Sequence, residues 1–167
     1  MLVGELTGLE TLCHLIVSNE LTSCTISVPN PANKSSNDST IELSVSLGKK
    51  TKNSVSLVNN SPYIQSHVYL EARVLSLSPN SDFLDPEYLK ALEEYVNSYM
   101  ESQISSYLYK TAKAYNSDII GFGRYVMKDF LTYEDWNNYN WLSNYKNSFF
   151  SVNVDTIVVS GYLFLDV

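Results

Sequence analysis

The sequence predicts one domain of the α+β class, in which a mostly antiparallel sheet of about five strands packs against one long helix with smaller flanking helices. Two patterns predict this class. Residues 22–74 alternate between apolar and polar side chains, as half-buried strands do, whereas from Pro86 onward apolar residues recur at helical spacing. The length of 167 residues suits a single domain, and a hydrophobic content of 44% is enough for one core. We therefore treat residues 1–167 as one domain.

A short helix is expected near the N-terminus. Thr7 and Glu10 have the spacing of a capping box, in which each side chain accepts a hydrogen bond from the other residue's backbone N–H. Apolar residues follow at helical spacing, and Ser18-Asn19 ends the pattern. The apolar positions are Leu9, Leu12, Leu15 and Ile16. Residues Leu2–Gly4 before this helix are interpreted as the end of a strand.

Four strands are expected in the next part of the chain. The alternating segments are Thr22–Val28, Thr40–Leu47, Val55–Leu57 and Ile64–Val74. Residues 30–39 read as a polar loop, Gly48–Asn53 as a turn, and Asn59–Pro62 as a break between the third and fourth strands. One face of this sheet should meet the core and the other should meet water.

The long helix begins at Pro86, which follows Asp85 and is a favourable first helical residue. It should be roughly 45 Å long at 1.5 Å per residue. Its apolar stripe is interpreted as the part of the core that covers the sheet, and Glu93-Glu94 as its solvated side. The stripe consists of Leu89, Leu92, Val96, Met100, Ile104, Leu108, Ala112 and Tyr115.

The stretch NSDIIGFGRYV raises two interpretations, a glycine loop that holds a phosphate or a joint between two closely packed helices. Phosphate-binding glycine loops usually follow a strand, and this one follows a helix, so the pattern favours the joint. Asp118 is expected to be the N-cap of a further helix, from about Gly123 to Phe130, and Ile119 and Ile120 to enter the core. Gly121 and Gly123 would let the backbone lie against the long helix, with Phe122 between them.

An aromatic connector, YEDWNNYNW, separates that helix from a last strand at roughly Phe150–Phe164. Tyr133, Trp136, Tyr139 and Trp141 form a candidate surface for a ligand or a partner, because aromatic rings can stack on sugars or bases. In a connector, such rings more often seal the edge of a core.

Composition and motifs argue against several classes of function. The net charge of −7, without a basic run, makes nucleic acid a poor partner. His14 and His67 are the only histidines, and no third ligand at suitable spacing ties them to a metal site. No nucleophile elbow or phosphate-binding loop with its lysine is present. We expect no cofactor and no catalytic residues.

The two cysteines, Cys13 and Cys24, predict neither a zinc cluster nor a disulfide framework. Leu21–Cys24 spells a lipobox, but acidic residues interrupt the apolar segment before it and no Lys or Arg precedes it. Cys24 is therefore interpreted as a small buried residue on a strand. A lipid anchor, if the protein has one, would lie upstream of Met1.

Several motifs, in order along the chain, resemble the C-terminal domain of the C subunit of bacterial spore germinant receptors, the Ger(x)C lipoprotein family. The family's a-D-i-f-G-F-G motif corresponds to Ser117–Gly123, and its opening K-L-V-G-x-L to Leu2–Leu6. Its D-P-E helix start corresponds to Asp85–Glu87, and its final V-N-V and T-G to Val152–Val154 and Ser160-Gly161.

This resemblance implies a non-enzymatic component of a nutrient germinant receptor that acts in receptor assembly or signal coupling during spore germination. Its partners would be the membrane-embedded A and B subunits. The full-length protein would be lipid-anchored at the outer surface of the spore inner membrane, and this chain would be a soluble part of it. The alternative is a small-ligand-binding module of a cell-envelope lipoprotein. An enzyme would need a pocket that gathers acids from separate elements, and no such set is identifiable in the sequence.

Overall fold

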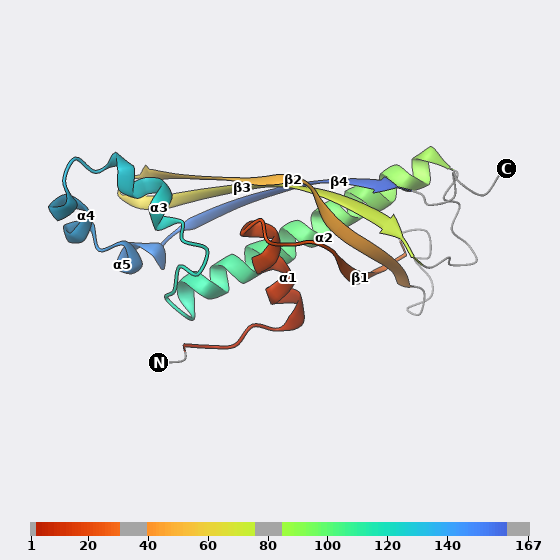
Figure 1. Ribbon diagram of the computed structural model, residues 1–167, viewed down its shortest axis with the longest axis horizontal. Coiled ribbons are helices and arrows are strands. Elements are labelled where there is room, and N and C mark those ends of the chain that lie inside the picture. The colour runs from red at the N-terminus through yellow and green to blue at the C-terminus, as the bar shows by residue number, and fades with distance from the viewer. Residues whose placement is uncertain (1–2, 31–39, 76–84, 160–167) are drawn as a thin grey trace.

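The computed structural model describes residues 3–30, 40–75 and 85–159. Four described strands form one sheet in the order β1-β2-β3-β4, in which β3 and β4 are parallel and the other neighbours antiparallel. Helices α1 and α2 lie on one side of this sheet and α3, α4 and α5 gather at one end (Figure 1). The α+β class is confirmed, with four described strands in place of about five. The strands are β1 (Cys24–Pro29), β2 (Thr40–Val58), β3 (Ser61–Val74) and β4 (Phe149–Val159), and the helices are α1 (Gly8–Val17), α2 (Pro86–Lys113), α3 (Gly123–Val126), the 3-10 turn η1 (Met127–Asp129), α4 (Tyr133–Tyr139) and α5 (Trp141–Tyr145).

The predicted turn at Gly48–Asn53 was wrong, because β2 continues through it. The pairing with β3 shifts register between Leu47 and Lys49 and again between Lys49 and Lys52. Each shift inserts one extra residue into β2, which is a β-bulge. Because two residues are inserted, the alternation of side chains between the two faces of the sheet is the same before and after the bulges. Odd-numbered side chains therefore face the core on both sides of the bulges. The sequence shows this as a break in the alternation, which is also how a turn looks.

Of the other predictions about strands, some are confirmed, some are wrong and some lie outside the described residues. The predicted break at Asn59–Pro62 is confirmed only at Asn59 and Asn60, which both have positive φ, as the tightest hairpin turns require. Ser61 and Pro62 already belong to β3. Val3 and Gly4 lie outside regular structure, so they do not end a strand, and Leu2 lies outside the described residues. Cys24 is on β1 as expected but is only half-buried. The predicted loop at 31–39 and the end of the last strand beyond Val159 also lie outside the described residues.

Helix α2 begins as the sequence predicts. Asp85 is its N-cap and accepts a hydrogen bond from the backbone N–H of Glu87, and Pro86 is in the first turn. The stripe from Leu92 to Ala112 is buried against the sheet and α1. Tyr115 lies just beyond the helix, where its hydroxyl donates to the carbonyl of Glu5. Among the described residues, the core therefore lies between α2 and one face of the sheet, and side chains of the other face, such as Glu42 and Ile157, are exposed.

Helix α1 has the predicted capping box between Thr7 and Glu10. The Glu10 carboxylate also accepts two hydrogen bonds from the Lys110 ammonium, at 2.7 and 2.9 Å, and this contact links α1 to α2. These bonds, first from Lys110 and then from the backbone of Thr7, lower the pKa of Glu10 below its ordinary value of 4.5. A lowered folded-state pKa means that the ionised form stabilises the fold.

We predict that Glu10→Gln loses less stability on acidification than the wild type. The Glu10 contribution is fully present above the unfolded-state pKa and disappears as pH falls through the lower folded-state pKa, so the difference should appear below about pH 4.5. Thermal unfolding of both proteins between about pH 6 and pH 3 measures it. Parallel curves for the two proteins across this range would contradict the assignment.

Side chains of α2 cover the outer edge of β4. Glu93 accepts a hydrogen bond from the backbone N–H of Val158, Asn97 from Thr156 and Glu101 from Val154, at 2.9, 2.8 and 3.0 Å. Four helix residues rise about 6.0 Å and two strand residues about 6.6 Å, so the two spacings match. The expectation that Glu93 lies on the solvated side was therefore wrong, although Glu94 is exposed. We call Glu93, Asn97 and Glu101 the edge-capping residues.

A second sheet edge, on β2, is covered by the end of α1. The Asn19 side chain accepts from the backbone N–H of Thr51 at 2.6 Å and donates to its carbonyl at 3.2 Å, as a neighbouring strand would. The Thr51 hydroxyl donates to the carbonyl of Ile16, and the Asn53 amide donates to that of Val17. Unpaired strand edges invite association with other chains, and these contacts cover backbone groups that could otherwise pair in that way.

Candidate functional site: the glycine joint and its aromatic neighbours

The loop between α2 and α3 is organised around the carboxylate of Asp118. Its Oδ1 accepts hydrogen bonds from the backbone N–H groups of Gly121 and Phe122, both at 2.9 Å, and its Oδ2 from that of Gly123 at 2.8 Å. Oδ2 also accepts from the indole N–H of Trp141 at 2.8 Å. The amides that a bound phosphate would need therefore already face an anion of the protein itself.

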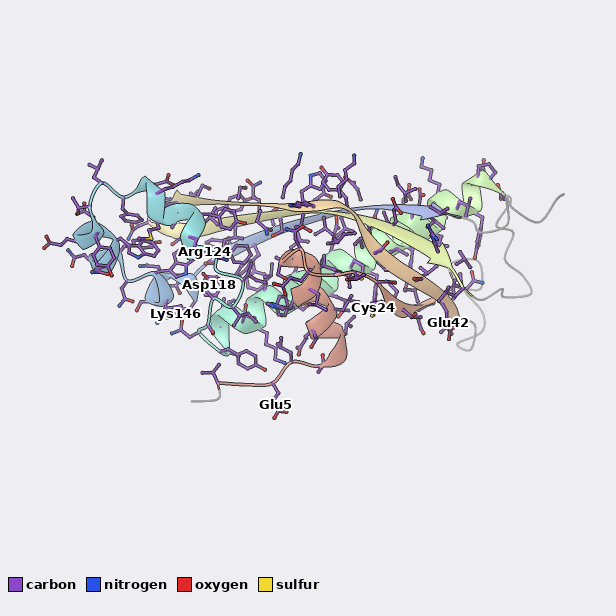
Figure 2. All side chains as sticks on the ribbon, in the orientation of Figure 1. Glu5, Cys24, Glu42, Asp118, Arg124 and Lys146 are labelled. Carbon is purple, nitrogen blue, oxygen red and sulfur yellow. The ribbon has the colours of Figure 1, made fainter. Side chains whose placement is uncertain are left out.

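The carbonyls of the same loop are covered by Arg124. Its guanidinium donates to the carbonyl of Ile120 at 3.3 Å and to that of Gly121 at 3.4 Å. Asp118 and Arg124 lie at the end of the molecule occupied by α3, α4 and α5, and Lys146 lies there too (Figure 2). The loop is thus held on both sides by its own side chains, which leaves its backbone little capacity for a polar ligand.

The structure corrects two expectations about this loop. The N-cap of α3 is Phe122, which makes no side-chain capping bond, so Asp118 binds the loop amides from farther upstream than an N-cap does. Ile120 is buried, but Ile119 is 42% exposed and does not enter the core. Phe122 is completely buried between the two glycines. The predicted helix to Phe130 is present as α3 followed by η1.

The two glycines serve different purposes. Gly121 has φ of +81°, a left-handed conformation that side chains rarely adopt. Gly123 has ordinary backbone angles, but a Cβ there would lie 2.9 Å from Nε1 of Trp141 and 3.0 Å from its Cδ1. The expected partner of the glycines was the long helix. The neighbour of Gly123 is instead the indole of Trp141, which comes from the connector.

The aromatic connector folds into α4 and α5, and its rings pack on one another. Trp136 stacks on Tyr139 and on Trp141, with ring centroids 6.3 and 6.0 Å apart. Tyr139 and Trp141 are each 8% exposed, Trp136 is half-buried, and Tyr133 is 69% exposed. The four residues therefore do not form one open surface, and Tyr133 is the one of them that is largely exposed.

The aromatic cluster connects the joint to α2 through Tyr145. Its ring lies 5.6 Å from that of Trp141, and its hydroxyl is 3.2 Å from the hydroxyl of Thr111 on α2. Tyr145 is fully buried, and this burial raises the pKa of its hydroxyl above the ordinary range. The Tyr139 hydroxyl donates to the carbonyl of Asn60 in the β2–β3 turn. The joint, the connector and the sheet end are therefore one packed unit.

We predict that Gly123→Ala destabilises the protein by about 1–3 kcal/mol, because the new methyl group would overlap the rigid indole of Trp141. The Trp141–Asp118 hydrogen bond should lengthen, so tryptophan fluorescence of the folded protein should also change. The matched control is Gly8→Ala, since nothing lies within 4 Å of a Cβ at Gly8. That control should be neutral or more stable by up to about 0.5 kcal/mol. Equal stability of the two variants would contradict the close packing.

The two histidines lie apart and each has its own partner. Nδ1 of His14 is 2.9 Å from the hydroxyl of Tyr107 on α2. His67 is on β3, with Nε2 2.7 Å from the carboxylate of Asp155 on β4. Within residues 3–30, 40–75 and 85–159, no group of three or more His, Cys, Asp and Glu side chains could hold a metal ion. None of the described helices has the length and apolar character to cross a membrane.

The segment from η1 to the start of α4 presents exposed apolar side chains to solvent. Leu131 is 98% exposed, Tyr133 69% and Met127 44%. We call these three residues the η1–α4 patch, since they run from η1 to the start of α4. Chemically, the region can bury apolar surface against another molecule, and its polar groups hold the loop in shape.

Comparison with known proteins agrees with this architecture. The crystal structure of the GerBC protein superposes with a TM-score of 0.74 at 17% sequence identity, over 94% of this chain. That match covers 47% of the GerBC chain, so the present chain spans about half its length. Comparison with curated protein sequences gave no significant match. The sequence profile of the family described as "Spore germination B3/GerAC like, C-terminal" matches residues 1–161. The chain therefore belongs to the spore germination B3/GerAC-like family, the C-subunit family of germinant receptors.

Proposed function

We propose that this domain is a non-catalytic part of a spore nutrient germinant receptor that supports receptor assembly or couples the nutrient signal to germination. Its partners would be the membrane-embedded A and B subunits. An upstream lipid anchor would hold the full-length protein at the outer surface of the spore inner membrane. The family match over residues 1–161 is the observation that carries this proposal.

The described side chains support a role in binding other proteins more than one in chemistry. The carboxylate with the most hydrogen bonds at the joint, Asp118, accepts from three backbone amides and an indole, so it is committed to holding the loop. The alternative of a ligand module that uses Tyr133, Trp136, Tyr139 and Trp141 is weaker, because Tyr139 and Trp141 are almost fully buried.

The η1–α4 patch is the part of this region that we propose contacts a partner subunit. Leu131 and Tyr133 have exposed fractions of 98% and 69%, and large apolar side chains in one short segment often mark interaction sites. Tyr133 was already part of the candidate surface from the sequence. Met127 at 44% exposure extends the patch toward α3.

The test is the double variant Leu131→Ser/Tyr133→Ser in the full-length protein. We expect slower nutrient-triggered germination and weaker co-purification with the A and B subunits, at an unchanged level of the variant protein in spores. The control is Ile157→Ser, which removes an apolar side chain that is 64% exposed on β4. The role of the patch is refuted if the double variant germinates and co-purifies like the control.

Deletion of the whole domain tests the broader proposal. Spores that lack this domain but keep normal levels of the A and B subunits should germinate poorly with nutrients and normally with a stimulus that bypasses the receptor. Normal nutrient germination in such spores would refute a role in assembly or coupling.

A further inference from the structure

A pocket of about 400 Å³ lies where the end of α2 meets the α5–β4 connection. Its volume is in the range of small-molecule sites. Tyr109 and Lys113 come from α2, Ser61 begins β3, and Phe149 begins β4. The remaining lining residues are the connection itself, Lys146, Asn147 and Ser148. We call this the Lys113–Lys146 pocket.

The charge of this pocket is opposite to that of the protein. The chain has a net charge of −7, yet the seven lining residues include two lysines and no aspartate or glutamate. Among the described residues, neither lysine forms an ion pair. The Lys113 ammonium lies 5.0 Å from the centre of the Tyr109 ring, and this cation–π contact favours a position of the ammonium beside the pocket. Two cations in a lining that includes no carboxylate favour binding of an anion.

Ser148 is an independent sign of a ligand. The residue is 3% exposed, and its hydroxyl has no hydrogen-bond partner among the described groups of the protein. An unpaired buried hydroxyl is unfavourable, so such groups are rare unless they serve a purpose. The backbone around it is well held, since the N–H of Asn147 donates to the carbonyl of Asn144 and that of Ser148 to the carbonyl of Tyr145. Ser148 therefore brings to the pocket lining a hydroxyl that no described group of the protein uses.

The wall of the pocket continues into an apolar recess. Ser61 and Phe149 line both the pocket and a neighbouring hollow of about 330 Å³, which is also lined by Val58, Asn59 and Tyr63. Phe149 is 62% exposed and Val58 54%. An anion that carries an apolar group could place its charge between the lysines and its apolar part against these side chains.

We propose that the Lys113–Lys146 pocket binds a carboxylate or phosphate group that carries an apolar portion. The lysines attract the charge, the Ser148 hydroxyl donates a hydrogen bond to it, and Phe149 contacts the apolar portion. The group could belong to a free small molecule or to a lipid headgroup. This site differs from the connector surface expected from the sequence, and it does not depend on the proposed role of the η1–α4 patch.

Both lysines also lie at helix C-termini, Lys113 as the last residue of α2 and Lys146 as the C-cap of α5. Cations are favourable there in any protein, so the lysines alone would have a purely structural explanation. That explanation predicts that their removal lowers stability with or without a ligand. It does not account for the unpaired Ser148 hydroxyl.

The experiment compares four proteins by calorimetric titration with acetate, benzoate and inorganic phosphate, and by co-sedimentation with phosphatidylcholine vesicles with or without phosphatidylglycerol. The proteins are the wild type, Lys113→Gln/Lys146→Gln, Ser148→Ala, and the control Lys90→Gln/Lys128→Gln. The control removes two exposed lysines that do not line the pocket. It therefore makes the same change in net charge.

We expect the wild type and the control to bind benzoate more tightly than acetate, or to bind vesicles only when phosphatidylglycerol is present. The first result identifies a free anion as the ligand and the second a headgroup. The pocket-lysine variant should lose about tenfold or more in affinity, and Ser148→Ala about three- to tenfold. Without ligand, Ser148→Ala should melt at the same or a higher temperature, because it loses no hydrogen bond within the protein.

The proposal is overturned if none of the probes binds, or if the pocket-lysine variant and the control lose affinity equally. It is also overturned if Ser148→Ala binds as tightly as the wild type while melting at a lower temperature, because that hydroxyl would then be structural.

Discussion

Replacement of Asp118 by alanine is expected to lower the free energy of unfolding by about 3 kcal/mol. The carboxylate accepts four hydrogen bonds, from three consecutive backbone N–H groups and from the Trp141 indole. Hydrogen bonds to charged groups contribute about 1.5–3 kcal/mol each, and water can replace part of them because Asp118 is only half-buried. Urea unfolding followed by circular dichroism measures the loss, and tryptophan fluorescence reports whether Trp141 has moved.

The matched control for this prediction is Asp129→Ala, which removes an exposed carboxylate of η1, eleven positions farther along the chain. An exposed substitution of this kind usually changes stability by no more than about 0.5 kcal/mol. If Asp118→Ala matched the control, the carboxylate would not be what organises the loop.

The second large effect is expected from removing the edge-capping residues together. The triple variant Glu93→Ala/Asn97→Ala/Glu101→Ala leaves the backbone N–H groups of Val154, Thr156 and Val158 without their partners on α2. We expect a loss of about 3–4.5 kcal/mol, at roughly 1–1.5 kcal/mol for each bond. The uncovered edge should also pair with other copies of the chain, so the variant should self-associate. Urea unfolding and light scattering at several concentrations measure the two effects.

A shifted triple variant, Glu94→Ala/Ser98→Ala/Ser102→Ala, is the control, because these residues lie one position along α2 and are exposed. It should associate no more than the wild type and keep nearly all its stability. Self-association of both triple variants, or of neither, would mean that the edge-capping residues do not protect β4.

Local signals were enough to predict several elements. The Thr7–Glu10 capping box, the Asp85-Pro86 start of α2 and the asparagine turn between β2 and β3 all depend on residues within a few positions of one another. Their hydrogen bonds form between near neighbours in the chain, so the sequence pattern alone contains both partners. The apolar stripe of α2 can also be predicted from the sequence, because helix geometry places those side chains on one face wherever the helix lies.

The errors came from contacts between distant residues. Glu93 looks like a solvent-facing helix residue until β4 lies beside it, 65 positions farther along the chain. Gly48–Asn53 looks like a turn until the bulges of β2 are seen in its pairing with β3. In both cases the local sequence pattern is compatible with two structures, and only the contacts with the neighbouring strand distinguish them.

The joint shows the same difference between features set by nearby residues and features set by distant ones. The sequence by itself determined that the Asp118–Gly123 motif follows a long helix and contains residues suited to a tight backbone, and it determined the α+β class. Only the tertiary structure decided that Trp141, 23 positions away, donates to Asp118 and lies against Gly123. The physical reason is that hydrogen bonding and close packing act over a few ångströms in space, whatever the separation along the chain.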